Sequence, residues 1–137
     1  MNLLLEIITP EKTVFKDEVS EVVVPTVNGE IAILPNHIDL LTQINPGELI
    51  VKKGSTQQSL AITGGFLEVS DNKVSILASY AIKAQDIEIA RATEAKKRAE
   101  KIMTEKTTDN ELKIAQGELI KAILELKIAT KHRRRVS

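Results

Sequence analysis

The stretch GFLEVSDNKVSILASYAIKAQDIEIARATEAKKRAEKIM, Gly65 to Met103, contains the change in periodicity that decides the fold. Its first half alternates apolar and polar residues, as FLEVS and KVSIL, on either side of Asp71 and Asn72. Alternation with a period of two is typical of a half-buried strand, and the Asp-Asn pair fits a hairpin turn. From Ala84 onward the stretch lacks Gly and Pro and is rich in Ala, Glu, Lys and Arg, which all favour helix. We therefore predict strands before this point and helices after it.

Upstream of this change, short aliphatic and β-branched runs are separated by turn residues. The runs are LLLEIIT, SEVVVPTV, GEIAIL, GELIVKK and QSLAIT. Pro46-Gly47 has the signature of a tight turn, and Gly64-Gly65 permits a bend or bulge where a side chain would collide. Strands at this spacing predict an N-terminal antiparallel β-sandwich over residues 1–82.

Downstream, the sequence predicts two helices separated by the polar segment TEKTTDN. Thr108 and Glu111 have the spacing of a capping box, which predicts that a second helix opens there and runs to about Lys131. Apolar residues follow a 3-4-3-4-3 spacing along this second helix, and alanines dominate a matching seam on the first. We expect an antiparallel helical hairpin with a basic tail over residues 83–137, and hence the α+β class. The predicted seams are Leu112, Ala115, Leu119, Ala122, Leu126 and Ala129 on the second helix, and Ala92, Ala95, Ala99 and Ile102 on the first.

The alanine-rich seam predicts a weakly held hairpin. An alanine contributes one methyl group to a core, whereas a fully buried leucine contributes about 1.5–3 kcal/mol. Gly117 inside the second helix costs a further ~1 kcal/mol relative to alanine. We therefore expect that the two helices can separate, or dock elsewhere, at modest cost.

Composition excludes several classes of protein. The chain has 137 residues, no cysteine and only 2% aromatic residues, so disulfide frameworks, thiolate metal sites and aromatic stacking platforms are not expected. No apolar run approaches the roughly 20 residues of a membrane-spanning helix. The N-terminal segment MNLLLEIITPEKTVF lacks a basic region and a long apolar run, so we do not expect a signal peptide.

Charge is distributed unevenly although the net charge is zero. Residues 1–80 contain ten acidic and five basic residues, whereas residues 81–137 contain nine acidic and fourteen basic ones. The C-terminal KHRRRVS could bind nucleic-acid phosphates, bind an acidic protein, or serve only solubility. No nucleic-acid recognition fold is visible in the sequence. These residues leave open a small β-sandwich binding module whose basic helical tail binds nucleic acid or an acidic protein.

Glu30, His37 and Asp39 form the densest cluster of chemically active residues in the strand region. One histidine and two carboxylates could bind a divalent metal or act as an acid–base pair. However, the chain has only two histidines and no HExxH, nucleophile or phosphate-loop motif. A loop stiffened by proline that presents polar contacts is the favoured interpretation, and we predict no catalytic residues.

Arg91 and Arg98 lie seven residues apart, so the predicted first helix places them on one face two turns apart. Two guanidinium groups on one face could hold a polyphosphate. The alternative is a solvated basic face that Glu88 and Glu94 balance.

Three quoted segments together resemble one known family. GEIAILPNHIDLLTQINPGELIV (29–51), AITGGFLEVSDNKVSILA (61–78) and AQDIEIARATEAKKRAE (84–100) are similar to the epsilon subunit of F-type ATP synthases, in that family's order and spacing. The resemblance covers nearly the whole chain. It departs from the family pattern at Ala32 and Asn36, where glycines are common, and at Ile38-Asp39, where Ala-Pro is common.

The resemblance implies a non-catalytic subunit of the rotating central stalk. Its sandwich would dock on the gamma subunit and on the c-subunit ring. Its hairpin would fold against the sandwich or extend toward the alpha and beta subunits, where it inhibits ATP hydrolysis. No cofactor is required, no nucleic acid is involved, and the protein would be peripheral to the membrane through its complex. The location would be the cytoplasmic face of a bacterial plasma membrane or the stromal side of a plastid thylakoid.

The same resemblance assigns candidate contacts. Glu30 and His37 would face the c ring, with Asp39 as an additional acid there. The motif (I/L)-D-x-x-R-A, which binds ATP in some bacterial members, has Glu in place of Asp here, so any regulatory ATP on the hairpin would be weakly bound. Its residues are Ile87, Glu88, Arg91 and Ala92, with Arg98 matching a further arginine. The residues that would meet an acidic segment of the beta subunit are Lys121, Lys127, Lys131, Arg133, Arg134 and Arg135.

Overall fold

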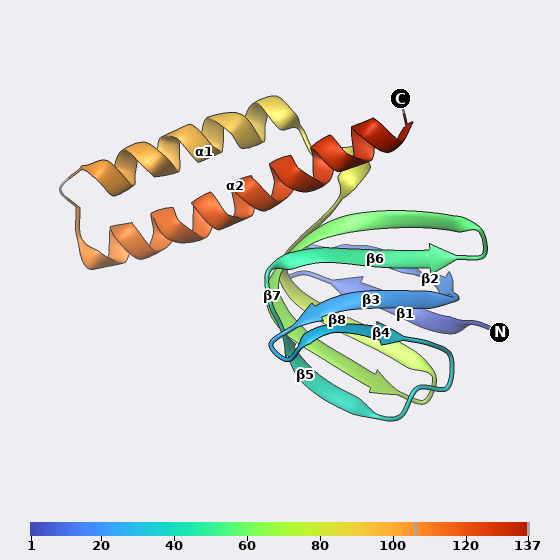
Figure 1. Ribbon diagram of the computed structural model, residues 1–137. Coiled ribbons are helices and arrows are strands. Elements are labelled where there is room, and N and C mark those ends of the chain that lie inside the picture. Colours follow the sequence, from blue (N-terminus) through green and yellow to red (C-terminus); the bar gives the residue numbers. More distant parts are fainter. Residues whose placement is uncertain (106, 137) are drawn as a thin grey trace. The chain divides into compact units, whose positions relative to one another are not determined.

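The computed structural model describes residues 1–105 and 107–136, without the side chain of Val136, and divides the chain into two units, Met1–Lys83 and Ala84–Ser137 (Figure 1). Lys106 in the expected break and Ser137 in the expected tail lie outside the described residues. The first unit contains eight strands. They are β1 (Leu3–Ile8), β2 (Thr13–Val19), β3 (Glu21–Thr26), β4 (Gly29–Ile33), β5 (Leu40–Ile44), β6 (Gly47–Lys53), β7 (Thr56–Ser70) and β8 (Lys73–Lys83).

The strands form the expected β-sandwich, in which neighbours follow the order β2-β1-β8-β7-β5-β3-β4 and β6 pairs with β3 and β7. Strand β7 links the layers because it pairs with β6 up to Ile62 and with β5 from Gly65 onward. Figure 1 shows β7 curving between these two partners. The expectation of purely antiparallel pairing is wrong at one place: β1 runs parallel to β8, with Leu4 opposite Lys73.

The core of the sandwich consists of large aliphatic side chains at alternate strand positions. In β1 and β3 every second residue is buried, as the two-residue period of a sheet with one covered face requires. The fully buried large residues include Leu5, Ile7, Ile33, Leu49, Leu60, Ile62, Leu67 and Ile76. Because these residues come from both layers, they fix the register of the strands.

Gly65 marks a close approach between neighbouring strands. Its φ is +144°, and a Cβ built there would lie 2.0 Å from the backbone oxygen of Leu77. Only glycine tolerates both conditions. The sequence predicted two runs separated by a bend at Gly64-Gly65, whereas β7 is one continuous strand that changes partner there.

The second unit contains a 3-10 helix, η1 (Ala84–Asp86), followed by α1 (Ile89–Thr104) and α2 (Asp109–Val136), and the two α-helices pack side by side as an antiparallel hairpin (Figure 1). Helix α1 begins at Ile89, later than the expected Ala84. Glu88 is its N-cap and makes no side-chain capping bond. Helix α2 opens as predicted, since Thr108 Oγ1 accepts a hydrogen bond from Glu111 N–H at 3.1 Å. It continues past the expected end at Lys131, so the arginines of the expected tail are helical.

The hairpin core consists mostly of alanine. Ala92 and Ala99 of α1 are buried, and so are three alanines of α2 spaced seven residues apart, which confirms five positions of the predicted seam. The α2 alanines are Ala115, Ala122 and Ala129. The other predicted positions are half-buried, and Ile128, which was not predicted, is buried. Within the part of the chain that the structure describes, no helix is long and apolar enough to cross a membrane.

Candidate functional site

The first candidate site is the loop between β4 and β5. His37 N–H donates to the Leu34 carbonyl at 3.2 Å, and Asn36 has a φ of +64°. Proline at the second position of a β-turn and a left-handed Asn at the third are typical of a type II turn. The ring Nδ1–H of His37 donates to the Ile38 carbonyl at 2.7 Å, which fixes that proton because a carbonyl oxygen can only accept. The turn bond and the ring bond therefore restrict the loop and fix the orientation of the His37 ring.

Only one of the two acidic residues of this site lies beside the turn, because Glu30 is at the end of β4 that joins β3. Glu30 is in β4 opposite Pro25, Asp39 directly precedes β5, and both are exposed. Ile38 between the turn and Asp39 is 80% exposed. Residues 1–105 and 107–136 contain no group of three or more His, Cys, Asp or Glu side chains that could hold a metal ion. The loop thus presents a mixed polar and apolar contact surface.

The second candidate site is the start of α1. Ile87 is buried, and Glu88 caps the helix with its backbone carbonyl, which accepts the Ala92 N–H at 3.0 Å. The Glu88 carboxylate lies 3.9 Å from Arg91 Nε, and both side chains are mostly exposed. This ion pair agrees with the second of the two hypotheses for this helix, a solvated basic face whose charge nearby glutamates balance. Arg98 lies two turns further along α1, at the edge of a separate pocket.

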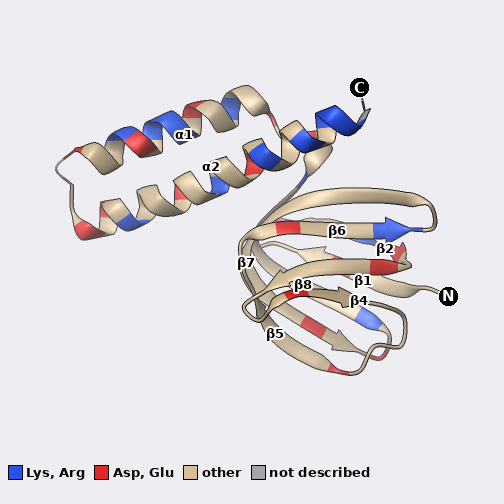
Figure 2. Cartoon of the chain, in the orientation of Figure 1, with Lys and Arg blue, Asp and Glu red and all other residues tan. Residues whose placement is uncertain are grey.

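The third candidate site is the basic end of α2, where lysine and arginine gather in the last turns (Figure 2). Because α2 is helical through this segment, Lys127, Lys131 and Arg134 lie at i, i+4 and i+7 and share one face. Arg135, four residues after Lys131, borders the same face, and Lys121 lies near its edge. Arg133 points to another side of the helix, so the six residues do not form one surface. Cations in the last turn also stabilise a helix through its dipole.

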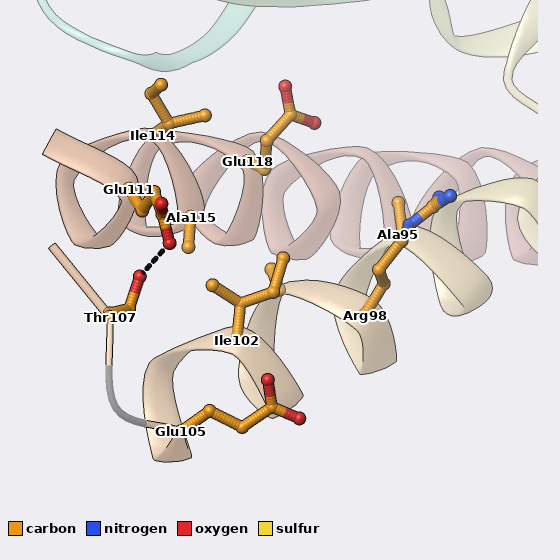
Figure 3. A pocket seen from close by; sticks show the side chains of 10 residues that line it. Ala95, Arg98, Ile102, Glu105, Thr107, Glu111, Ile114, Ala115 and Glu118 are labelled. Atoms are coloured by element: carbon orange, nitrogen blue, oxygen red, sulfur yellow. Dashed lines mark hydrogen bonds between the residues drawn. The ribbon is translucent and has the colours of Figure 1, made fainter.

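A pocket between α1 and α2 was not anticipated from the sequence (Figure 3). It has a volume of about 610 Å³ and lies near the closed end of the hairpin. Small residues on both helices, Ala95, Ala99 and Ala115, leave this space, and the alanine seams were the signal that could have revealed it. Charged side chains border it, and the Thr107 hydroxyl donates to the Glu111 carboxylate at its rim. The charged residues are Arg98, Glu105, Glu111 and Glu118.

A second unanticipated feature is an exposed apolar pair on the sandwich. Phe66 of β7 and Leu77 of β8 are opposite each other in the sheet, and each is 57% exposed. With Ile8 and Pro10 they line a hollow of about 400 Å³. The chain contains only two phenylalanines, so exposure of one of them indicates a contact surface.

Two family models match consecutive parts of the chain. The model of the ATP synthase delta/epsilon chain β-sandwich domain matches residues 2–84, and the model of the delta/epsilon chain long α-helix domain matches residues 85–130. The chain belongs to the ATP synthase delta/epsilon family.

Curated members of this family are similar over nearly the full chain. The ATP synthase epsilon chain of Dehalococcoides mccartyi strain BAV1 is 46% identical over 133 residues, which cover 96% of this chain and 95% of the relative. That of Herpetosiphon aurantiacus is 40% identical over 135 residues, 98% of this chain and 99% of the relative. Epsilon chains of this family are non-catalytic stalk subunits of their complex, so the prediction that this chain is not an enzyme is confirmed.

Chains in two solved mitochondrial ATP synthase structures have the same fold. A chain in the mitochondrial ATP synthase of Euglena gracilis, determined as an OSCP/F1/c-ring assembly, superposes with a TM-score of 0.66 at 20% identity and covers 99% of this chain and 82% of its own length. A chain in the central stalk/c-ring structure of the Tetrahymena thermophila enzyme gives a TM-score of 0.64 at 16% identity, covering 92% of this chain and 95% of its own. At these identities the likeness concerns the fold.

Proposed function

We propose that this ATP synthase subunit is a part of the rotating central stalk that couples proton flow through the c ring to ATP synthesis in the catalytic head. The observation that carries the proposal is the match of both family domains in order, over residues 2–130. The shared fold with chains in the Euglena gracilis OSCP/F1/c-ring assembly and in the Tetrahymena thermophila central stalk/c-ring structure supports it. The subunit is peripheral to the membrane, on the cytoplasmic face of a bacterial plasma membrane or the stromal side of a thylakoid.

The β4–β5 loop is the proposed contact with the c ring. Its turn holds His37 and is followed by the exposed Asp39, while the exposed Glu30 lies at the opposite end of β4. Surface carboxylates and an imidazole are suited to polar loops, and a fixed backbone lowers the entropy lost on docking.

The Phe66–Leu77 pair is the proposed contact with the gamma subunit. A contiguous exposed apolar patch on a sheet is typical of protein interfaces. The sandwich thus has two chemically different surfaces, one polar loop and one apolar sheet face, for two partners.

The hairpin is the proposed regulator of ATP hydrolysis, acting through the alpha and beta subunits. Lys127, Lys131 and Arg134 on one face of α2 would meet an acidic segment of the beta subunit. Exposed ion pairs contribute only about 0.2–1 kcal/mol each, so the contact depends on several of them and weakens with salt.

Weak regulatory binding of ATP at the start of α1 is proposed through Ile87, Glu88, Arg91, Ala92 and Arg98. The Glu88–Arg91 pair would have to open before Arg91 could bind phosphate, which supports weak rather than tight binding. We expect the amide signals of α1 to shift only at millimolar ATP, and Arg91→Ala to abolish the shift. Unchanged spectra at that concentration would remove this site.

ATP hydrolysis by the matching alpha-beta-gamma head tests the main proposal. The head is assayed with the full chain and with a version that ends at Lys83, where β8 ends. We expect both to bind gamma and only the full chain to inhibit. If both bind and neither inhibits, the stalk role is supported and the inhibitory role of the hairpin is wrong. If neither binds gamma, the stalk role is wrong, and salt-dependent binding of duplex and single-stranded nucleic acid becomes the next measurement.

A further inference from the structure

Asn72, in the turn between β7 and β8, lies where three distant segments of the sandwich meet. Leu40 is opposite Val69 in the β5–β7 pair, so the loop that precedes β5 approaches the turn that follows β7. Leu4 is opposite Lys73 in the β1–β8 pair, which brings the N-terminal segment to the same turn. In Figure 1 the N-terminus, the β4–β5 loop and the β7–β8 turn lie on one side of the sandwich.

The side chain of Asn72 binds both of its neighbours. Its Oδ1 accepts the backbone N–H of Asn36 at 2.9 Å, and its Nδ2 donates to the Asn2 carbonyl at 2.9 Å. Its backbone carbonyl also accepts the Leu4 N–H at 3.2 Å. One amide thus uses its acceptor on the loop and its donor on the N-terminal segment, because an Asn side chain carries both groups.

The bond to Asn36 reaches the centre of the type II turn. Such a turn bonds only its outer residues to each other, here Leu34 and His37, so the N–H of Asn36 needs a partner elsewhere. Asn72 supplies that partner from 36 positions away in the sequence. The residue next to the anchored amide is His37, and Ile38 follows it.

We propose that Asn72 is a positioning residue that holds the β4–β5 loop in the geometry with which it contacts the c ring. The inference rests on the proposed c-ring contact of Glu30, His37 and Asp39. A loop tied at its centre presents His37 and Ile38 in one arrangement, so less entropy is lost when it docks. Without the Asn72–Asn36 hydrogen bond, the turn would retain its internal Leu34–His37 bond, but the loop could move relative to the ends of β4 and β5.

The turn conformation allows a substitution that removes only the side chain. Asn72 has a φ of +59°, where glycine is at least as favourable as asparagine. Asn72→Gly therefore preserves the turn and removes both side-chain bonds. Asn72→Asp keeps an acceptor for Asn36 and removes the donor to Asn2. Asp71→Gly, at a φ of +50° in the same turn, is the matched control.

Amide hydrogen exchange in the isolated full chain is the first measurement. We expect Asn72→Gly to speed exchange at Asn36 roughly five- to tenfold, the factor that one ordinary hydrogen bond confers, and Asn72→Asp and Asp71→Gly to leave it near the original rate. The midpoint of thermal unfolding should stay nearly unchanged. Unaltered exchange at Asn36 in Asn72→Gly would overturn the inference.

Binding of each variant to a purified c ring that carries gamma is the second measurement. We expect Asn72→Gly to bind several-fold more weakly and Asn72→Asp to bind like the original chain. Equal binding by all variants, with exchange at Asn36 accelerated in Asn72→Gly, would overturn the positioning role while leaving the proposed stalk function intact. If the unmodified chain fails to bind the ring, the proposed c-ring contact itself is wrong, and the positioning role is overturned with it.

Discussion

The sandwich and the hairpin are held together by side chains of very different size. Leucine, isoleucine and valine fill the sandwich, and many of them are entirely inaccessible to solvent. Apart from Ile87 and Ile128, the helical unit instead buries alanines, five of them on α1 and α2, with leucines only half-buried beside them. At about 0.8 kcal/mol per buried methylene-sized group, an alanine seam holds two helices much less firmly than a leucine core holds two sheets.

This difference matches the roles proposed for the two units. A subunit that transmits torque needs a scaffold that stays folded under load, and the sandwich core provides it. A regulatory element that docks and is released needs contacts whose gain or loss changes the free energy only a little. Alanines provide such contacts, because they let helix axes approach closely while burying little apolar surface. The predictions that follow test whether the two units differ in this way.

Gly65→Ala should produce the largest effect, and only in the sandwich. The new Cβ would collide with the backbone of Leu77 and Ala78, and a φ of +144° strains any side chain. Because backbone atoms of the β7–β8 ladder cannot yield cheaply, we expect a loss of about 4–5 kcal/mol in the free energy of unfolding. Denaturant titration followed by circular dichroism measures it.

Gly64→Ala is the matched control for this experiment. Its Cβ would meet only Ser79 Oγ at 3.8 Å, so the loss should be limited to about 1 kcal/mol from its positive φ. Equal losses in the two variants would show that backbone strain, and not the close approach of the strands, explains why glycine is needed at Gly65.

Ala122→Leu should open the hairpin and leave the sandwich unchanged. Ala122 is 1% exposed in the seam, so a leucine there forces the helices apart at a cost of about 1–3 kcal/mol. We expect faster amide exchange throughout α1 and α2 with unchanged rates in the β-strands. Gln116→Leu on an exposed position of α2 is the control. Accelerated exchange in the strands as well would mean that the two units do not unfold independently.

Gly117→Ala should stabilise α2. A Cβ at Gly117 meets no atom within 4 Å, so the substitution gains only the helix propensity of alanine, about 1 kcal/mol. Amide exchange in α2 should slow about fivefold. The same change from glycine to alanine therefore has opposite signs in the two units. A loss of stability at Gly117 would contradict the exposure of this position.

The smallest effect concerns a surface pair of the sandwich. The Lys53 ammonium, 2.5 Å from Asp17, lowers the pKa of Asp17, and the Glu18 N–H adds to the shift. A lowered pKa in the folded state contributes stability above the ordinary value of 3.8, and this contribution disappears as pH falls through the folded pKa. Asp17→Asn should therefore lie slightly below the original chain in stability at neutral pH and converge with it in acid. A constant difference at all pH values would exclude the ion pair as the cause.

Most strands and both helices could be predicted because their periodicity is local. Strand β2 was missed because only Phe15 and Val19 of TVFKDEV are buried, which leaves no alternation to recognise. Strand β5 was missed because Leu41 is 70% exposed, against the rule that places leucine inside. The start of α1 was misplaced because Glu88 is not one of the residues that cap helices well. The predicted end of α2 at Lys131 was too early. The helix continues because no glycine or proline follows Lys131 to end it.

The residues of the candidate loop could be predicted from the sequence, but the hydrogen bond that holds the loop in place could not. The sequence identified the LPNH loop from its proline, its polar tip and its family resemblance. It contained no signal that Asn72 bonds to Asn36, because that contact joins residues 36 positions apart and depends on the pairing of β5 with β7. The Phe66–Leu77 surface was hidden for a related reason: alternation shows which residues share a face, but not which face is covered.

The parallel pairing of β1 with β8 bears on how the protein is made. The ribosome releases β1 first among the strands and β8 last, so one edge of β1, whose other edge pairs with β2, lacks its partner until nearly the whole sandwich has been synthesised. Such non-local pairing folds slowly and leaves a strand edge open to wrong partners in the meantime. The hairpin needs only local contacts and can form soon after its own residues emerge. A nascent chain interrupted before Lys73 is therefore aggregation-prone, whereas one interrupted within the hairpin already contains a closed sandwich.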